Sequence, residues 1–301
     1  MDYKAKFEPK GNKVIHGAGQ SFKRFREYWT AVKENKPLIF MTYFKFVEID
    51  KWIEKTKKAL EEYPNLILQI GLKMQKDSKD ITKEISEGKY DRELDKLIET
   101  IKEIKNPVFI RIGYEFDWPD RFKPKSFVKA WRYTVDYYRK KQINNIATVW
   151  CSCPFPGSSP VEPFYPGDNY VDWFGIDVFS KKNFENDKYL PVKNFLKLAK
   201  KHKKPVMIGE STPARVGVDK GKESWDEWFK PYFEWIRKHP NIKAFCYINW
   251  DWKEDYNKPE WLNAKIQDNE IVRKNFVKEL SKPNYLHNQA ISTFLKKVYT
   301  N

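Results

Sequence analysis

Short apolar segments alternate with longer amphipathic segments along the whole chain. Eight short segments are rich in Ile, Val and Phe, and they occupy residues 14–17, 38–44, 66–72, 108–115, 146–151, 173–178, 206–210 and 242–250. Continuous apolar runs of this length are typical of strands that are buried on both faces of a sheet. The longer segments repeat apolar residues every three or four positions, as amphipathic helices do.

Several helices can be placed from this pattern. One apolar stripe consists of Leu94, Leu97, Ile98, Ile101 and Ile104. Ser126 is a candidate N-cap for the next helix, and Pro191 suits the first turn of a later one. Further helices are predicted at residues 225–239 and 290–299. Strand–helix alternation implies parallel strands with right-handed crossovers, in a closed barrel or a large open sheet. Eight units favour a single (β/α)8 TIM barrel domain over residues 1–301.

The composition is that of a globular protein with many aromatic residues. Of the 301 residues, 41% are hydrophobic, 33% are charged and 17% are aromatic, with 12 Trp. So many aromatic rings must fill a core or line a surface that grips flat apolar faces. The Trp residues on helical segments are expected to pack against the barrel, namely Trp29, Trp52, Trp131, Trp225, Trp228 and Trp235.

The net charge of +16 raises the question of a polyanionic partner. The lysines are scattered in short groups, which favours a solvated surface over a nucleic-acid interface. Attraction to an acidic polymer is a milder reading of the same charge. No apolar run is long enough for a membrane span, so we expect no membrane partner. We also expect no nucleic-acid partner, and a monomer. The start of the chain lacks a signal-peptide core, so a cytoplasmic protein and a mature form without its leader both stay open.

Three cysteines do not form a recognisable framework. Their number is odd, and Cys151 and Cys153 are separated by one residue rather than the two of common metal and redox motifs. No cluster of His or Asp has the spacing of a metal site. We therefore expect a reaction without metal or cofactor.

In a barrel of this kind, active sites form at the carboxyl ends of the strands. The residues at those ends include His16, Tyr43, Phe44, Gln69, Lys73, Arg111, Tyr114, Glu115, Trp150, Asp177, Phe179, Glu210, Asn249, Trp250, Asp251 and Trp252. Aromatic rings stack on the apolar faces of sugars, and cleavage of a glycosidic bond uses two carboxyl groups. This set of residues therefore favours carbohydrate chemistry.

Two glutamates end strands that are otherwise almost entirely apolar. Glu115 and Glu210 are candidates for the two carboxyl groups, because glutamate is rarely buried without a partner. The alternative is a structural ion pair of either one with Arg111. Arg111 lies four positions before Glu115 on one strand face, where its charge would keep Glu210 ionised.

Other candidates have two readings each. His16 either contacts sugar hydroxyls or is a hydrogen-bonded residue of the barrel. Asp177 either orients a neighbour or, slightly favoured, caps the following loop. Trp118 and Trp150 are expected to line the site because they follow strands. Asp117 has no recognisable calcium-loop spacing.

Three sequence blocks resemble glycoside hydrolase family 26, a clan A family of retaining enzymes acting on β-mannan and related β-glycans. They are FIRIGYEFDW at residues 109–118, YPGDNYVDWFGID at 165–177 and PVMIGES at 205–211. The resemblance implies Glu115 as acid/base and Glu210 as nucleophile. It also implies Arg111 as a supporting residue and Trp250 or Trp252 as a sugar platform.

Two positions depart from the family pattern. Tyr114 stands where the family usually has His. Phe179 stands where it usually has a Tyr that hydrogen-bonds the nucleophile, and Phe cannot donate. Either the hydroxyl of Tyr247 or Tyr43 substitutes, or Glu210 is tuned differently.

The leading hypothesis is a retaining, endo-acting hydrolase of a polysaccharide or oligosaccharide, on β-mannan, β-glucan or a related glycan. Double displacement predicts carboxyl groups about 5–5.5 Å apart. The alternative, which the two departures suggest, is a carbohydrate-binding barrel with impaired catalysis.

Overall fold

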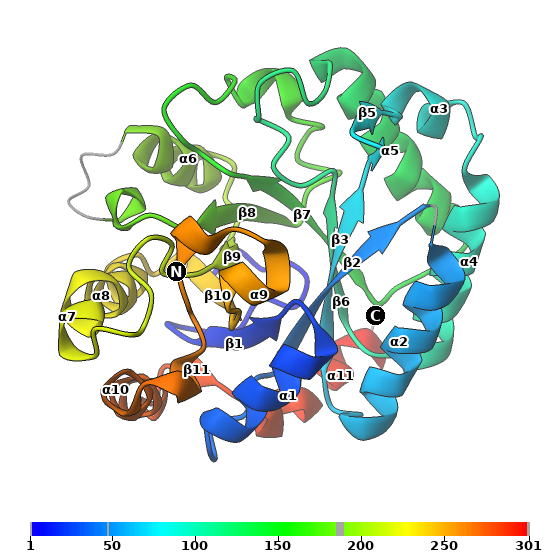
Figure 1. Cartoon of the computed structure of the whole chain (residues 1–301). Helices are drawn as coiled ribbons and strands as arrows, with labels where there is room; N and C mark the ends of the chain where they lie inside the picture. The colour runs from blue at the N-terminus through cyan, green and yellow to red at the C-terminus, as the bar shows by residue number, and fades with distance from the viewer. Residues whose placement is uncertain (1, 47, 185–189, 300–301) are drawn as a thin grey trace.

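Eight parallel strands close into a barrel in the computed structural model, which describes residues 2–46, 48–184 and 190–299. The strands follow the order of the chain around the barrel, and β10 pairs with β1 to close it (Figure 1). Their bounds are β1 Val14–Gly19, β2 Ile39–Lys45, β3 Ile67–Lys73, β6 Val108–Ile112, β7 Ile146–Ser152, β8 Trp173–Val178, β9 Val206–Ser211 and β10 Ile242–Ile248. The predicted (β/α)8 barrel is confirmed.

Helices follow the strands and surround the barrel (Figure 1). Their bounds are α1 Phe22–Ala31, α2 Ile49–Glu62, α3 Thr82–Ser86, α4 Asp91–Ile104, α5 Pro124–Lys140, α6 Leu190–Lys201, α7 Lys222–Ser224, α8 Lys230–Lys238, α9 Trp252–Tyr256, α10 Glu270–Leu280 and α11 Ile291–Tyr299. The predicted stripe on α4 is buried from Leu94 to Ile101. Ser126 is not an N-cap, because α5 begins two residues earlier at Pro124.

Alternate strand residues fill two separate apolar layers. Ile15, Ile67 and Phe109 point into the barrel, whereas Leu68 and Ile110 pack between the sheet and the helices. Side chains of a strand alternate between its faces, so each buried strand contributes to both layers. The continuous apolar character of the strands follows from this burial on both sides.

Three short strands were not predicted. β4 Gln75–Lys76 and β5 Lys79–Asp80 form a small antiparallel hairpin beyond β3. β11 Tyr285–Leu286 adds to the start of β1. Each has only two residues, too few to show a hydrophobic period.

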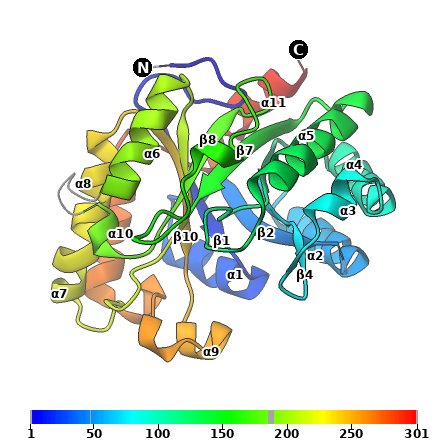
Figure 2. The ribbon, with the colours of Figure 1, turned by 90° about the horizontal axis from the view of Figure 1, so that it is seen from above.

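The two faces of the barrel differ. Both ends of the chain lie at one face, and the β4 hairpin and α9 lie at the other (Figure 2). At the face with the termini, Phe7 packs against Phe109 inside the barrel, and the buried Lys243 donates to the carbonyl of Gly11. The opposite face is therefore left for a site. Within the described residues, no helix is long and apolar enough to cross a membrane.

Candidate active site

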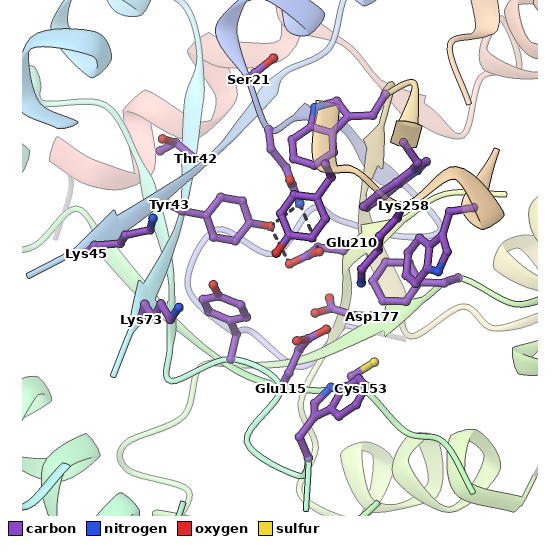
Figure 3. A pocket seen from close by; sticks show the side chains of 18 of the residues that line it. Ser21, Thr42, Tyr43, Lys45, Lys73, Glu115, Cys153, Asp177, Glu210 and Lys258 are labelled. Atoms are coloured by element: carbon purple, nitrogen blue, oxygen red, sulfur yellow. Dashed lines mark hydrogen bonds between the residues drawn. The ribbon is translucent and has the colours of Figure 1, made fainter. Parts of the chain in front are cut away.

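A cavity of about 1440 Å³ opens at the carboxyl ends of the strands. Residues from the ends of β2, β8 and β9 and from the loops after β1, β6 and β10 line it. Figure 3 shows Glu115, Asp177 and Glu210 together in this cavity. The structure thus brings the two predicted carboxyl groups into one site.

Glu210 is held by three donors. The hydroxyl of Tyr43 donates to Oε1 at 2.6 Å, and Arg111 Nη1 donates to the same oxygen at 2.9 Å. Gln20 Nε2 donates to Oε2 at 3.2 Å and also to the Tyr43 hydroxyl at 2.8 Å. The side chain is 9% exposed, so it reaches the cavity through a small opening. Three donors around one carboxyl group suit an ionised, precisely oriented carboxylate.

Tyr43, rather than Tyr247, supplies the hydroxyl that Phe179 lacks. The Tyr247 hydroxyl donates to the carbonyl oxygen of Ala264 at 2.6 Å, away from Glu210. Phe179 packs against Trp261, with ring centroids 5.0 Å apart. Burial and the charge of Glu210 raise the pKa of Tyr43 well above its usual value, so the hydroxyl stays a donor. The hydroxyl that the family places after the sixth strand therefore comes from β2 here.

Arg111 joins Glu210 to Asp177. Its guanidinium is fully buried, with Nη1 on Glu210 and Nη2 on Asp177. It crosses β9 at Gly209, where a Cβ would lie 2.7 Å from Asp177 Oδ1 and 2.9 Å from Arg111 Cζ. Glycine is required here because any side chain would displace this ion pair. Arg111 thus supports Glu210, as predicted, and it does so through the ion pair that was the alternative reading.

Asp177 orients Arg111 and does not cap the following loop. The turn at residues 181–183 is capped by Ser180, whose side chain accepts from the Lys182 amide. Burial raises the pKa of Asp177 well above its usual range, and the charge of Arg111 opposes that rise. The slightly favoured reading of Asp177 as a loop cap is therefore wrong.

Glu115 lies in a turn rather than in a strand. β6 ends at Ile112, and Gly113 and Glu115 both have positive φ, at 54° and 53°. The strand predicted to continue to residue 115 is therefore three residues too long. The turn is fixed by the Glu115 amide, which donates to the carbonyl of Cys151 at 2.8 Å.

The carboxyl group of Glu115 has different surroundings from that of Glu210. Glu115 Oε2 accepts from Arg121 Nη1 at 3.1 Å, and the Glu115 side chain is 15% exposed. Burial first, and the negative charge of Glu210 second, raise the pKa of Glu115, while Arg121 and Arg111 lower it. A carboxyl group with a raised pKa beside a second carboxylate that accepts several hydrogen bonds suits a proton donor.

Most predicted substrate-binding residues line the cavity. Arg111 Cζ lies 4.9 Å from the centroid of the Tyr114 ring. Tyr114 and Phe179 both line the cavity. Trp118 is 42% exposed at the rim. Trp250 and Trp252 pack against each other with centroids 5.1 Å apart, and both contribute to the wall. Aromatic side chains therefore contribute to the cavity wall, and Trp118 is the most exposed of the three tryptophans.

Trp150 and His16 do not line the cavity. The prediction that Trp150 lines the site is wrong, and of the two readings of His16 the structure bears out the hydrogen-bonded residue of the barrel. Trp150 is fully buried, stacks on Phe116 and donates to the carbonyl of Phe164 at 3.1 Å. His16 is also fully buried, 2.6 Å from the Tyr28 hydroxyl. Both side chains point outward from the barrel, because strand residues alternate between faces.

Gln20, Arg121 and Lys258 are among the cavity residues that were not predicted as site residues. Gln20 follows β1, which extends two residues beyond the predicted strand end at 17. Arg121 and Lys258 come from loops after β6 and α9, where no hydrophobic period indicates position. Asp117 faces away from the cavity and accepts from Ser152 Oγ at 2.7 Å and from the Cys153 amide at 2.9 Å.

Metal ligation is not indicated by the part of the chain that the structure describes. No group of three or more His, Cys, Asp or Glu residues there is arranged to hold a metal ion. Glu115, Asp177 and Glu210 of the cavity are instead paired with Arg111 or Arg121.

The sequence model described as Glycosyl hydrolase family 26 matches residues 55–251, well over half of the chain. The chain belongs to this family. A β-1,3-xylanase TXYA of Vibrio sp. is 27% identical over 255 residues, covering 75% of this chain and 54% of the relative. A β-1,3-xylanase of Alcaligenes sp. is 27% identical over 267 residues, covering 79% of this chain and 55% of the relative. This family 26 chain thus spans about half the length of these relatives.

Solved structures of the family have the same fold. The β-mannanase BoMan26A of Bacteroides ovatus superposes with a TM-score of 0.61 at 17% identity, over 92% of this chain and 88% of that one. GH26C of a Muricauda species gives a TM-score of 0.66 at 15% identity, with the same coverage. At these identities the likeness extends to the barrel architecture.

Proposed function

We propose that the chain is a retaining, endo-acting hydrolase of β-linked polysaccharides, with Glu115 as acid/base and Glu210 as nucleophile. The observation that carries the proposal is the contrast between two glutamates in one cavity. Glu210 accepts from three donors, whereas burial and the charge of Glu210 raise the pKa of Glu115. One group is suited to attack and the other to protonation.

In the first step, Glu115 gives its proton to the glycosidic oxygen while Glu210 attacks the anomeric carbon. The C–O bond to the leaving sugar breaks, and a glycosyl–enzyme ester forms. Oxygen Oε1 of Glu210 is engaged by both Tyr43 and Arg111, whereas Oε2 has Gln20 alone. Oε2 is therefore the attacking atom in this proposal, and Oε1 keeps its donors throughout.

In the second step, the Glu115 carboxylate takes a proton from water, and the water oxygen attacks the anomeric carbon from the vacated side. The ester bond to Glu210 breaks, and the sugar leaves with retained configuration. Glu115 ends protonated and Glu210 ionised, so both groups return to their starting states. Arg111 keeps a positive charge beside Glu210 during both displacements.

An endo-acting enzyme needs a site that accepts the interior of a chain. The cavity has a volume of about 1440 Å³, and Trp118 is 42% exposed at its rim. An exposed aromatic ring there gives further sugar units a face to stack on. The β-1,3-xylanases and the β-mannanase among the similar proteins make β-1,3-xylan and β-mannan the first substrates to test.

The test is a screen on β-1,3-xylan, β-mannan, mixed-linkage glucan and β-1,4-xylan with wild type, Glu115→Gln and Glu210→Gln. The proposal expects hydrolysis of at least one polymer, retained anomeric configuration by NMR, and losses of about 10³-fold or more in both variants. A 2-fluoro sugar with a good leaving group should label Glu210. Full activity in either variant overturns the residue assignment, and tight binding without turnover identifies a carbohydrate-binding barrel instead.

A further inference from the structure

Lys45 and Lys73 lie next to each other at the ends of adjacent strands. They are register partners in β2 and β3, and both line the cavity. Like charges on directly opposed strand positions repel each other, so this arrangement destabilises the folded chain. Burial and the charges of Lys45 and Arg121 lower the pKa of Lys73.

Neither lysine is neutralised by a nearby acid. Within residues 2–46, 48–184 and 190–299, no carboxylate forms an ion pair with either one. The charge of Asp77 raises the pKa of Lys73, but less than the other effects lower it. Some other lysines are paired, as in Lys57 with Glu103 and Lys96 with Asp50.

The pair lies close to the reacting centre without being part of it. Lys45 is two residues beyond Tyr43 on the same strand face, roughly 7 Å along β2, and Tyr43 contacts Glu210. Figure 3 shows Lys45 and Lys73 on one side of the glutamates, and Lys258 on another. The Lys258 ammonium lies over the Trp261 ring at 4.7 Å. Cations therefore flank the cavity on two sides.

The acids of the cavity do not compensate for these cations. Apart from Glu48, the lining acids are Glu115, Asp177 and Glu210, which are already engaged with Arg111 and Arg121. An incoming ligand with negative charge would supply the missing partner. Lys offers a compact point charge, which suits a carboxylate or a sulfate ester without fixed fork geometry.

We propose that Lys45 and Lys73 form a subsite for an anionic substituent of the glycan, either a uronate carboxylate or a sulfate ester. This inference rests on the proposed function, because it names the substrate class of the same cavity. Lys258 provides a second cationic contact beyond the glutamates. The net charge of +16 further favours approach of an acidic polymer.

The experiment compares chemically matched chains. β-1,3-Xylan and β-mannan are each used unmodified, carboxymethylated and sulfated at low substitution. Binding is measured by calorimetry on Glu115→Gln, and kcat/KM is measured on the otherwise unchanged enzyme. The variant is Lys45→Gln/Lys73→Gln, and the control is Lys125→Gln/Lys129→Gln, which removes the same charge from exposed positions on α5.

The expected result is tighter binding of an anionic derivative than of its neutral parent at low ionic strength. Loss of both ammonium groups should reduce that preference by about tenfold, and added salt should weaken it. The α5 control should keep the preference. Carboxymethyl and sulfate forms separate the two sources of charge.

Equal binding of neutral and anionic chains, or an unchanged preference in Lys45→Gln/Lys73→Gln, overturns the inference. These outcomes are independent of the proposed catalysis. If no polymer is hydrolysed but anionic chains still bind through the two lysines, the proposed function fails and the subsite stands. If neutral chains are hydrolysed and charge has no effect, the subsite alone fails.

Discussion

The hydroxyl of Tyr43 donates to Glu210 Oε1 at 2.6 Å. Tyr43 belongs to β2, the neighbour of β1, on the opposite side of the barrel from Phe179. Gly71 makes room for this side chain, because a Cβ there would lie 2.7 Å from Tyr43 Cδ1. The donor to the proposed nucleophile is thus held by packing on β3. The hydrogen bond to Glu210 that the family pattern assigns to a Tyr at position 179 is thus made by Tyr43 of β2.

Replacing Tyr43 by Phe removes this donor and leaves the ring in place. A hydrogen bond to a charged group contributes about 1.5–3 kcal/mol, so we expect kcat/KM to fall by about 10- to 100-fold. The measurement is steady-state kinetics on the polymer identified by the substrate screen.

Two further variants make this prediction specific to the nucleophile. Tyr247→Phe removes a buried hydroxyl that bonds Ala264, so it should lower the melting temperature and leave kcat/KM largely intact. Phe179→Tyr in the Tyr43→Phe background restores a hydroxyl near the site and should recover part of the rate. Equal losses for Tyr43→Phe and Tyr247→Phe would indicate a purely structural effect.

Gly209→Ala is expected to damage the site more than the fold. The added Cβ would lie within 3 Å of both Asp177 and Arg111, so their ion pair must shift. We expect destabilisation of about 1–3 kcal/mol and a loss of activity of at least 100-fold, because Arg111 also positions Glu210. Denaturant unfolding and kinetics measure the two effects.

Val206→Ala is the matched control at the other end of β9. Val206 is fully buried, and its truncation costs a comparable free energy of unfolding, about 1–3 kcal/mol. It lies away from the cavity, so activity per folded molecule should be retained. If Val206→Ala loses as much activity as Gly209→Ala, instability rather than the ion pair explains both.

The barrel and the glutamate pair could be predicted because both follow from strand order. Eight apolar runs define eight strands, and the carboxyl ends of parallel strands share one rim, so Glu115 and Glu210 had to lie on the same face. Whether a strand residue points into the barrel or toward the helices changes with a shift of one position along the strand. Trp150 and His16 were misplaced for this reason.

Loop residues could not be predicted in the same way. Gln20 lies beyond the predicted end of the first strand, and Glu115 turns back at Gly113 through positive φ. A sequence pattern shows neither where a hydrogen-bonded ladder ends nor how a loop folds back. The role of Arg121 depends on such a loop, since its guanidinium also donates to the carbonyl oxygens of Tyr114 and Glu115.

Trp118, in the loop after β6, and Trp150, within β7, should respond in opposite ways to substitution. Trp118 is 42% exposed at the cavity, so Trp118→Ala should raise KM about 10-fold through loss of stacking, with little change in stability. Trp150→Phe should reduce the free energy of unfolding by about 1–3 kcal/mol and leave KM unchanged. A raised KM for Trp150→Phe would contradict the outward orientation of that ring.

The pH dependence of kcat/KM should report on Glu115. The acid must be protonated for the first step, so activity falls on the alkaline side as Glu115 loses its proton. Because burial and the charge of Glu210 raise the pKa of Glu115, that alkaline limb lies above the range of an ordinary glutamate. Arg121 opposes this shift through its positive charge and its hydrogen bond.

Replacing Arg121 by Gln removes that opposing charge and should move the alkaline limb to higher pH. Arg121→Lys keeps the charge, and its limb should stay closer to that of the wild type. The comparison separates electrostatics from loop support, because either substitution disturbs the bonds to the backbone carbonyls. A limb that moves to lower pH in Arg121→Gln, or that is the same in both variants, would show that Glu115 is not the titrating acid.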